Sequence, residues 1–110
     1  MIARMVHHRC NPQYMEKSRQ HVDRVGEVAA ITPGFVCRLR LDDPNDPSVI
    51  ITMTVWEEPD SLKAFQKSQE ATGPSEYDDY FIRVQAQLLD VASAKWQSPS
   101  PLDGKRSDLT

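Results

Sequence analysis

The residues best suited to chemistry are two adjacent histidines near the start of the chain, His7 and His8. Consecutive strand residues point to opposite faces, so this pair cannot readily bind one metal ion. His8 shares a face with Cys10, but two ligands fall short of the three or four that zinc uses. With an ordinary pKa of about 6.5, His8 can instead accept a proton at neutral pH as a general base. The alternative is a half-solvated histidine at a strand end, and both interpretations stay open.

Two arginines, Arg38 and Arg40, are the next candidates because they alternate on one face of a predicted strand. We expect them to pair with acidic residues across a dimer. The second interpretation is that they bind an anionic oxygen of a substrate. Glycine-rich phosphate loops, Ser-His-Asp spacing elements and CxxC pairs are absent from the sequence, which disfavours a nucleotide cofactor.

The elements that must position these residues follow from hydrophobic periodicity and turn residues. The expected order is β-α-β-β-α-β, with a strand at 2–9, a helix from Pro12 capped by Asn11, strands at 35–41 and 49–56 around a loop at 42–48, a short helix from Pro59, a longer helix at about 75–88, and a strand at 90–97. The strand at 49–56 is apolar on both sides, so we expect it to be central. Gly26 lies inside the first helix, where close packing on the sheet would explain it.

The aromatic residues of the second half have a structural interpretation first. Trp56 and Trp96 are expected as core or interface anchors. Tyr77 and Phe81 follow the helical stripe that continues to Val84 and Leu88 and predicts a buried helix face, with Leu62 and Phe65 buried in the helix before it. Tyr80 lies off that stripe, so it could line a pocket instead.

Composition narrows the class of protein. A chain of 110 residues with 39% hydrophobic content predicts one soluble domain. The net charge of −3 and the pI of about 5.5 argue against nucleic acid as a partner. No apolar run reaches the length of a membrane span, and no signal-peptide pattern opens the chain, so a cytoplasmic location is expected. Cys10 and Cys37 should be free thiols, because a third strand is expected between their two strands.

Several motifs together carry a family resemblance. They are Pro33-Gly34-Phe35, the Asp-Pro loop at 42–47, Thr54-Val55-Trp56-Glu57, and Leu62-Lys63-Ala64-Phe65. The chain resembles the antibiotic biosynthesis monooxygenase domain, a branch of the dimeric α+β barrel superfamily. The resemblance implies a ferredoxin-like, four-stranded antiparallel sheet with helices on one face, and a homodimer through the sheet face. The domain is expected to span residues 1–97, with a polar, disordered tail at 98–110.

The haem-degrading branch of that superfamily gives one test at residue level. Its members use an Asn late in the first strand, a Trp in the second helical region and a His on the helix that follows. The corresponding positions here hold His8 and Phe65, and no histidine follows His21. Haem binding by that mechanism is therefore not expected.

The resemblance implies two functions from different classes. The first is a monooxygenase without metal or cofactor, in which His8 deprotonates a quinol or polyketide phenol and the resulting anion reduces O₂. The second is a non-catalytic homodimer that binds a small aromatic molecule in the same pocket. The residues expected to bind that molecule are Trp56, Phe65, Tyr77, Tyr80 and Arg83.

Overall fold

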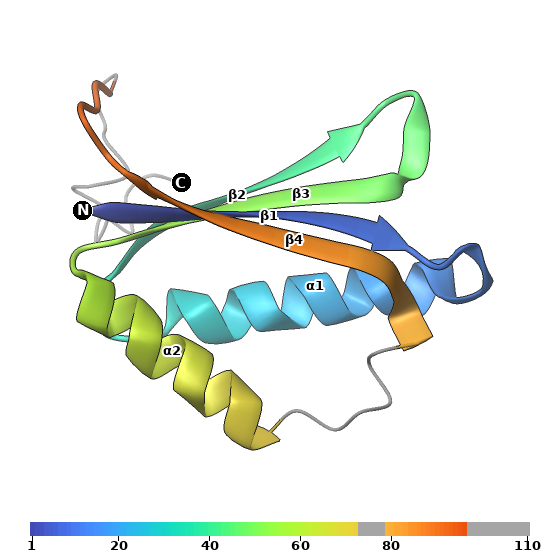
Figure 1. Ribbon diagram of the computed structural model, residues 1–110, viewed down its shortest axis with the longest axis horizontal. Helices are drawn as coiled ribbons and strands as arrows, with labels where there is room; N and C mark the ends of the chain where they lie inside the picture. The colour runs from blue at the N-terminus through green and yellow to red at the C-terminus, as the bar shows by residue number, and fades with distance from the viewer. Residues whose placement is uncertain (73–78, 97–110) are drawn as a thin grey trace, which may run out of the picture.

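The protein is an α+β fold with one antiparallel sheet and two helices on one of its faces (Figure 1). The computed structural model describes residues 1–72 and 79–96. Its elements are β1 (Ile2–Cys10), the 3₁₀ helix η1 (Pro12–Tyr14), α1 (Met15–Ala30), β2 (Phe35–Asp43), β3 (Asp46–Trp56), α2 (Pro59–Thr72) and β4 (Phe81–Asp90). The strand order β2-β3-β1-β4 confirms the ferredoxin-like βαββαβ prediction, with β3 in a central position.

The connection from β1 into α1 begins where the sequence predicts it. Asn11 is the N-cap of η1, and its side-chain oxygen accepts a hydrogen bond from the backbone N–H of Gln13 at 3.1 Å. Ser18, Val22 and Ala29 recur at helical spacing and are buried along α1, so they form the buried stripe of this helix. Gly26 is buried on the same side, so the glycine lies at the contact between the helix and the sheet.

Alternation along the strands divides the sheet into two faces. On β1, Val6 and Cys10 are buried on the side that α1 covers, together with Ile50 of β3. Cys37 pairs with Val55 in register and therefore belongs to the opposite face, which no described helix covers. The two cysteines are free thiols, and β3 lies between their strands as expected.

The hydrophobic core lies between the sheet and the helices in two clusters. One contains Ala29, Trp56, Leu62 and Phe65, and the other contains Cys10, Val22 and Ile50. Helix α2 begins at Pro59 and directs Leu62 and Phe65 inward as predicted. Trp56 is fully buried between Phe35 and Phe65, with ring centroids 5.7 and 5.2 Å away, so its predicted role as a core anchor is correct.

The last strand corrects the predicted assignment of the C-terminal half. The sequence predicts a helix through residue 88 and a strand at 90–97, but β4 occupies Phe81–Asp90 and residues 91–96 have no regular structure. Val84 and Leu88 fit a helical spacing, yet with Ala86 they also fit the two-residue period of a strand. Pairing with β1 decides between the two periods. Trp96 is exposed in the irregular segment, and residues 75–78 of the predicted helix lie outside the described residues.

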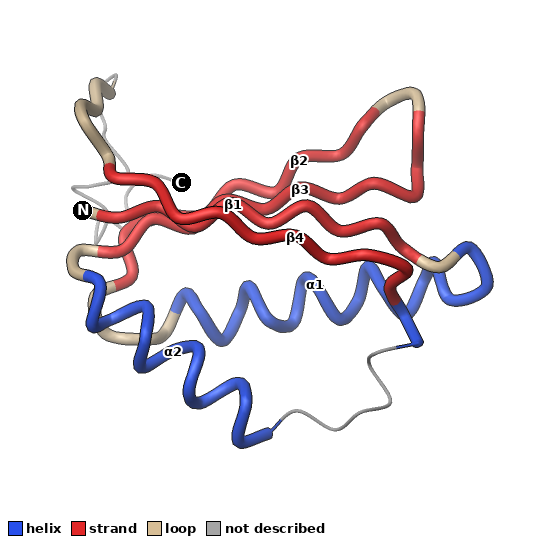
Figure 2. Tube along the Cα trace, viewed as in Figure 1, coloured by secondary structure: helices blue, strands red, loops and turns tan. Residues whose placement is uncertain are grey.

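The predicted loop at 42–48 is also wrong, because the chain turns over only two residues, Pro44 and Asn45 (Figure 2). The strands continue on both sides, and β3 contains Pro47. A proline is tolerated there because the register between β2 and β3 shifts between Asp42 and Asp43, so the regular ladder is already interrupted.

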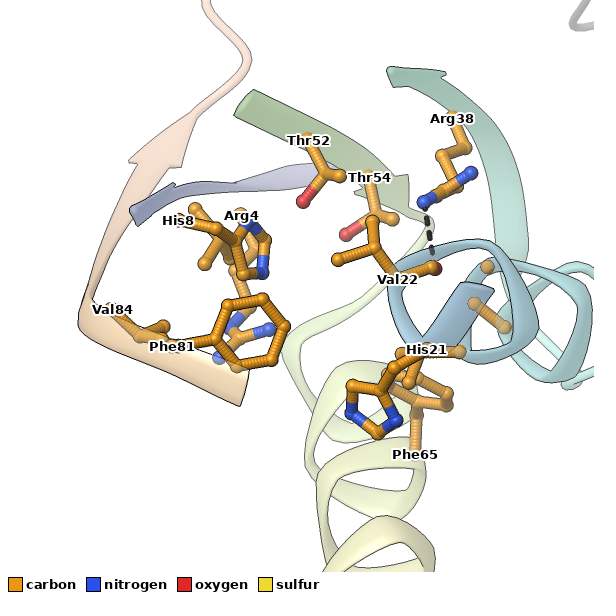
Figure 3. Close-up of a pocket in the computed structure, with 14 residues that line it drawn as sticks. Arg4, His8, His21, Val22, Arg38, Thr52, Thr54, Phe65, Phe81 and Val84 are labelled. Carbon is orange, nitrogen blue, oxygen red and sulfur yellow. Dashed lines mark hydrogen bonds between the residues drawn. The ribbon is translucent and has the colours of Figure 1, made fainter. Parts of the chain in front are cut away.

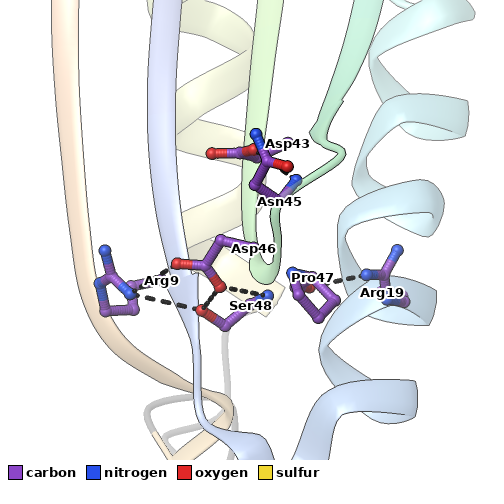
Figure 4. A network of polar contacts seen from close by, with 7 residues as sticks. All are labelled: Arg9, Arg19, Asp43, Asn45, Asp46, Pro47 and Ser48. Atoms are coloured by element: carbon purple, nitrogen blue, oxygen red, sulfur yellow. Dashed lines mark hydrogen bonds and ion pairs between the residues drawn. The ribbon is translucent and has the colours of Figure 1, made fainter.

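The aspartates of this hairpin accept local hydrogen bonds (Figure 4). Asp46 accepts from the backbone N–H and the hydroxyl of Ser48 at 3.0 and 2.6 Å. Arg9 of β1 contacts Asp46 at 3.3 Å, and Arg19 of α1 donates to the Pro47 carbonyl at 2.7 Å. Asp46 and Pro47, whose residue types favoured a long loop in the prediction, are thus accommodated in a strand by these hydrogen bonds.

The uncovered face of the sheet is apolar over much of its area, and we refer to it as the open face. Its members include Met5, Leu39, Leu41, Val49, Ile51 and Met53, which alternate with residues on the helix side. Leu39 and Leu41 remain 50% and 46% exposed. Leu39 and Leu41 therefore form a group of exposed apolar side chains, whereas exposed apolar residues on most monomer surfaces are scattered singly.

Candidate functional site

A cavity of about 270 Å³ lies between the helix side of the sheet and the two helices (Figure 3). Its apolar walls are Val6, Val22, Val25, Ala29, Phe65, Phe81 and Val84. Its polar lining consists of Arg4, His8, His21, Arg38, Thr52 and Thr54. Every described strand and both helices contribute at least one lining residue, so the cavity depends on the assembled fold.

The sheet register arranges the polar lining in rows. Thr54 of β3 is paired with Arg4 of β1 on one side and with Arg38 of β2 on the other. Two residues further along β3, Thr52 pairs with Val6 and Arg40. In Figure 3 the two threonine side chains point away from the sheet into the cavity. One face of three adjacent strands thus supplies the cavity lining with the guanidinium groups of Arg4 and Arg38 and with two hydroxyls.

His8 lies on this face with a defined hydrogen bond. Its Nδ1 is 3.1 Å from the carbonyl oxygen of Ile50. A carbonyl can only accept, so this contact requires the proton on Nδ1 and leaves Nε2 as the acceptor. The pKa of His8 is lowered by burial, and the positive charges of Arg4 and Arg38 act in the same direction, against the opposing effect of the Ile50 bond. The imidazole is therefore neutral at pH 7, and its Nε2 has a free lone pair that can accept a proton.

His21 faces the cavity from α1. Its ring centroid is 5.9 Å from that of Phe81, whose ring is in turn 5.3 Å from His8. Burial lowers the pKa of His21, and nearby Arg24 adds to the effect. Phe81 therefore lies in ring contact with two histidines, one from the sheet and one from the helix.

The two arginines predicted to act together have different environments. Arg40 is paired with Asp23 of α1 at 2.6 Å and with Asp42 at 3.4 Å. Arg38 lines the cavity, and its Nη2 donates to the Val22 carbonyl at 3.0 Å. Both lie on the helix side rather than the open face. The expectation that they pair with acids across a dimer is therefore wrong.

Two of the predicted site residues lie in the cavity. His8 and Phe65 line it directly. Trp56 does not line it, but the Trp56 indole N–H donates to the Thr54 hydroxyl oxygen at 3.0 Å and so helps to orient a lining residue. Tyr77 lies outside the described residues.

Tyr80 and Arg83 are not among the lining residues. The Tyr80 ring packs beside Tyr14 and His21, with centroids 5.7 and 6.3 Å away. Arg83 pairs in register with Arg9, which places it on the open face. The sequence prediction failed for Arg83 because the segment was assigned to a helix, and a strand presents alternate residues to opposite faces.

Sequence reasoning overlooked Arg4, His21, Thr52 and Thr54. Strict alternation along β1 already places Arg4 on the face of His8, so that signal was available. The threonines interrupt one side of an otherwise apolar strand, which is a weaker signal. His21 lies three residues after Ser18 on α1. Its position in the cavity could not be predicted, because it lies beside Phe81, whose segment was predicted as a helix and is a strand.

Within the described ranges, 1–72 and 79–96, no group of three or more His, Cys, Asp or Glu side chains is placed to hold a metal ion. None of the helices described is both long and apolar enough to cross a membrane.

The fold is that of the antibiotic biosynthesis monooxygenases. A proposed antibiotic biosynthesis monooxygenase from Nitrosomonas europaea superposes with a TM-score of 0.75 at 13% identity, over 84% of this chain and 100% of that one. A mutant form of SnoaB, a cofactor-independent oxygenase from Streptomyces nogalater, gives a TM-score of 0.68 at 14% identity, over 90% and 97%. No curated protein matches the chain significantly.

The sequence itself matches one family model. A family model described as a domain of unknown function, DUF3291, matches residues 1–91. The chain belongs to this family. Its fold is shared with the monooxygenases named above. Their sequence identities to this chain are low, so the likeness establishes the architecture alone.

Proposed function

We propose that this protein is a cofactor-independent monooxygenase of a small, electron-rich aromatic molecule such as a quinol or a polyketide-like phenol. The observation that carries the proposal is the placement of His8 in a cavity with apolar and aromatic walls, with Nε2 left as proton acceptor. The fold shared with a cofactor-independent oxygenase supports the same choice. We assign the activity to the unit at residues 1–97 and to the cytoplasm.

The proposed reaction begins with proton transfer from a phenolic O–H to His8 Nε2. The phenolate then supplies electrons to O₂. One oxygen atom replaces a ring hydrogen and the other leaves as water, while the quinol becomes a hydroxyquinone. The quinol provides all the electrons, so the reaction needs no external reductant. Phe65, Phe81 and the valines restrict water around the reacting ring.

Homodimerisation through the open face belongs to this proposal. The apolar members of that face, such as Leu39 and Leu41, are half-exposed in the single chain. A second copy would cover them, and a small domain gains stability by such burial. The cavity lies on the other side of the sheet, so pairing would leave it accessible.

The test is oxygen consumption with a panel of hydroquinones, followed by mass spectrometry of the product in ¹⁸O₂. Consumption that depends on the protein, with one labelled oxygen in the product, is expected. Saturable binding of the same compounds without oxygen consumption would overturn the catalytic proposal in favour of a homodimeric small-molecule-binding protein.

A further inference from the structure

The charge of the cavity points to a class of ligand. Its lining contains two arginines and two histidines, and none of its described lining residues is an aspartate or glutamate. Guanidinium groups removed from water without an anionic partner are costly. A cavity with this composition is matched by a ligand that brings negative charge.

Arg4 provides the clearest case. It lies on the central strand β1, and burial lowers its pKa. Among the described residues it forms no ion pair and no side-chain hydrogen bond, whereas two other arginines of the sheet, Arg9 and Arg40, both have aspartate partners. Arg4 is thus a half-buried cation whose partner is absent from the described part of the chain.

Thr54 adds a donor between the two arginines. It is in register with both Arg4 and Arg38, so the three lie in one row across the sheet. Its oxygen already accepts the indole N–H of Trp56 at 3.0 Å. The hydroxyl proton therefore remains available for an acceptor in the cavity.

Gly26 makes room for the second arginine. A Cβ atom at this position would collide with the guanidinium carbon and nitrogens of Arg38. Glycine inside a helix costs about 1 kcal/mol relative to alanine, so the position carries a cost in stability. This space lets the Arg38 guanidinium lie against α1, where it donates a hydrogen bond to the Val22 carbonyl at the wall of the cavity.

We propose that the cavity binds an organic carboxylate, with the acid group over Thr54 between Arg4 and Arg38 and an apolar, one- or two-ring body against Phe65 and Phe81. Guanidinium groups bind carboxylates through charge-assisted hydrogen bonds. The apolar walls require an apolar body, so a bare inorganic anion would leave most of the site unmatched. The inference rests on the proposed function, because it takes this cavity as the substrate site. It narrows the substrate to a phenol or quinol that carries a carboxylate group.

The test is calorimetric titration of the full chain with naphthoate, its neutral isostere naphthamide, and acetate. Naphthoate should bind at least about tenfold more tightly than naphthamide, because only the acid forms charge-assisted bonds. Acetate should bind more weakly than naphthoate because it lacks the apolar body. Equal affinity for naphthoate and naphthamide, or no binding of either at millimolar concentration, would overturn the inference.

Variants locate the binding. Arg4→Gln and Arg38→Gln should each weaken naphthoate binding about tenfold and leave naphthamide nearly unaffected. Lys63→Gln is the matched control, since it removes one positive charge from the exposed side of α2. Thr54→Val, which keeps the shape of the side chain, tests the hydroxyl separately if an arginine variant does not fold by circular dichroism. Equal losses in Lys63→Gln and the arginine variants would contradict a specific carboxylate site.

Oxygen consumption separates this inference from the proposed function. The compounds 2,5-dihydroxybenzoate and hydroquinone differ by the carboxylate alone. Faster consumption with the acid supports both proposals. Equal consumption with both, together with no preference for naphthoate, overturns the carboxylate site and leaves the oxygenase standing. Selective binding of acids without oxygen consumption overturns the oxygenase and supports the carboxylate site.

Discussion

Each face of the sheet departs in one region from the pattern that its surroundings predict. The face covered by helices holds Arg4, His8 and Arg38 around a cavity, while the uncovered face presents Leu39 and Leu41 to solvent. Covered faces of antiparallel sheets are ordinarily apolar and uncovered ones polar. The two proposals above explain these departures by a ligand in the cavity of the covered face and a second copy of the chain on the open face.

One strand shows the contrast at single-residue resolution. His7 and His8 are neighbours on β1 and pair with Ile51 and Ile50 of β3. His8 enters the cavity, while His7 is exposed on the open face. Their chemistry is the same, so any difference in their effects arises from the face on which each lies.

The largest expected effect comes from separating these two histidines. If the protein oxidises a quinol, His8→Ala should lower kcat by about 10²–10⁴-fold, because a positioned general base contributes that much. His7→Ala should retain the wild-type rate per protomer. Steady-state oxygen consumption measures both. Similar rates for the two variants would remove His8 as the base and break the functional distinction between the faces.

A charge on the open face should give the next largest effect. Leu39→Asp places a carboxylate in the proposed interface, and burying it should weaken dimerisation by about a hundredfold or more. Because Leu39 is half-exposed in the single chain, the monomer should still fold. Analytical ultracentrifugation measures the dissociation constant, with Ala64→Asp on the exposed side of α2 as control. A wild-type protein that is monomeric at micromolar concentration would contradict the open-face interface.

Much of this architecture was predictable, and the failures have identifiable causes. The alternation of β1, the cap at Asn11 and the stripe of α1 each follow from a local pattern that the tertiary structure keeps. The segment of β4 was ambiguous because Val84 and Leu88 satisfy both a helical and a strand period. Only pairing with β1 resolves such an ambiguity, and that is not a local property of the sequence.

The candidate site was less predictable than the fold. His8 and Phe65 were found because their types and strand or helix positions were clear. Arg83 was assigned to the site because its segment was predicted as a helix, whereas it lies on a strand. Arg4 was overlooked because its importance for ligand binding depends on its having no acidic partner within the described residues. The lack of an acidic partner can be recognised only from the three-dimensional positions of the neighbouring aspartates and glutamates.

Acidification should destabilise the covered face. Burial lowers the pKa of His8 below its ordinary value of about 6.5, so the unfolded chain binds this proton more readily than the folded protein. The free energy of unfolding should therefore be fully retained above pH ~6.5 and fall as the pH drops toward the folded pKa, with each unit of difference worth about 1.4 kcal/mol. His21 acts in the same direction.

Urea unfolding between pH 5 and pH 8, at roughly half-unit steps, measures this dependence. His8→Gln should flatten the decline, because glutamine does not titrate in this range. His7→Gln is the matched control, because it removes the neighbouring histidine from the other face of the same strand. A steeper decline in His8→Gln than in the wild type would contradict the assignment of a depressed pKa to His8.

The smallest expected effect tests how the backbone of α1 serves the covered face. Gly26→Ala adds a methyl group where the Arg38 guanidinium lies, and the flexible end of Arg38 can move away at little cost. The alanine should also favour the helix by about 1 kcal/mol, so the melting temperature should stay level or rise slightly. Naphthoate affinity should nevertheless fall by a few-fold, toward that of Arg38→Gln. In the double variant, Gly26→Ala should cause no further loss of affinity, because the guanidinium that it displaces is already gone. Equal losses in both backgrounds would show that the glycine acts on the cavity by a route other than Arg38.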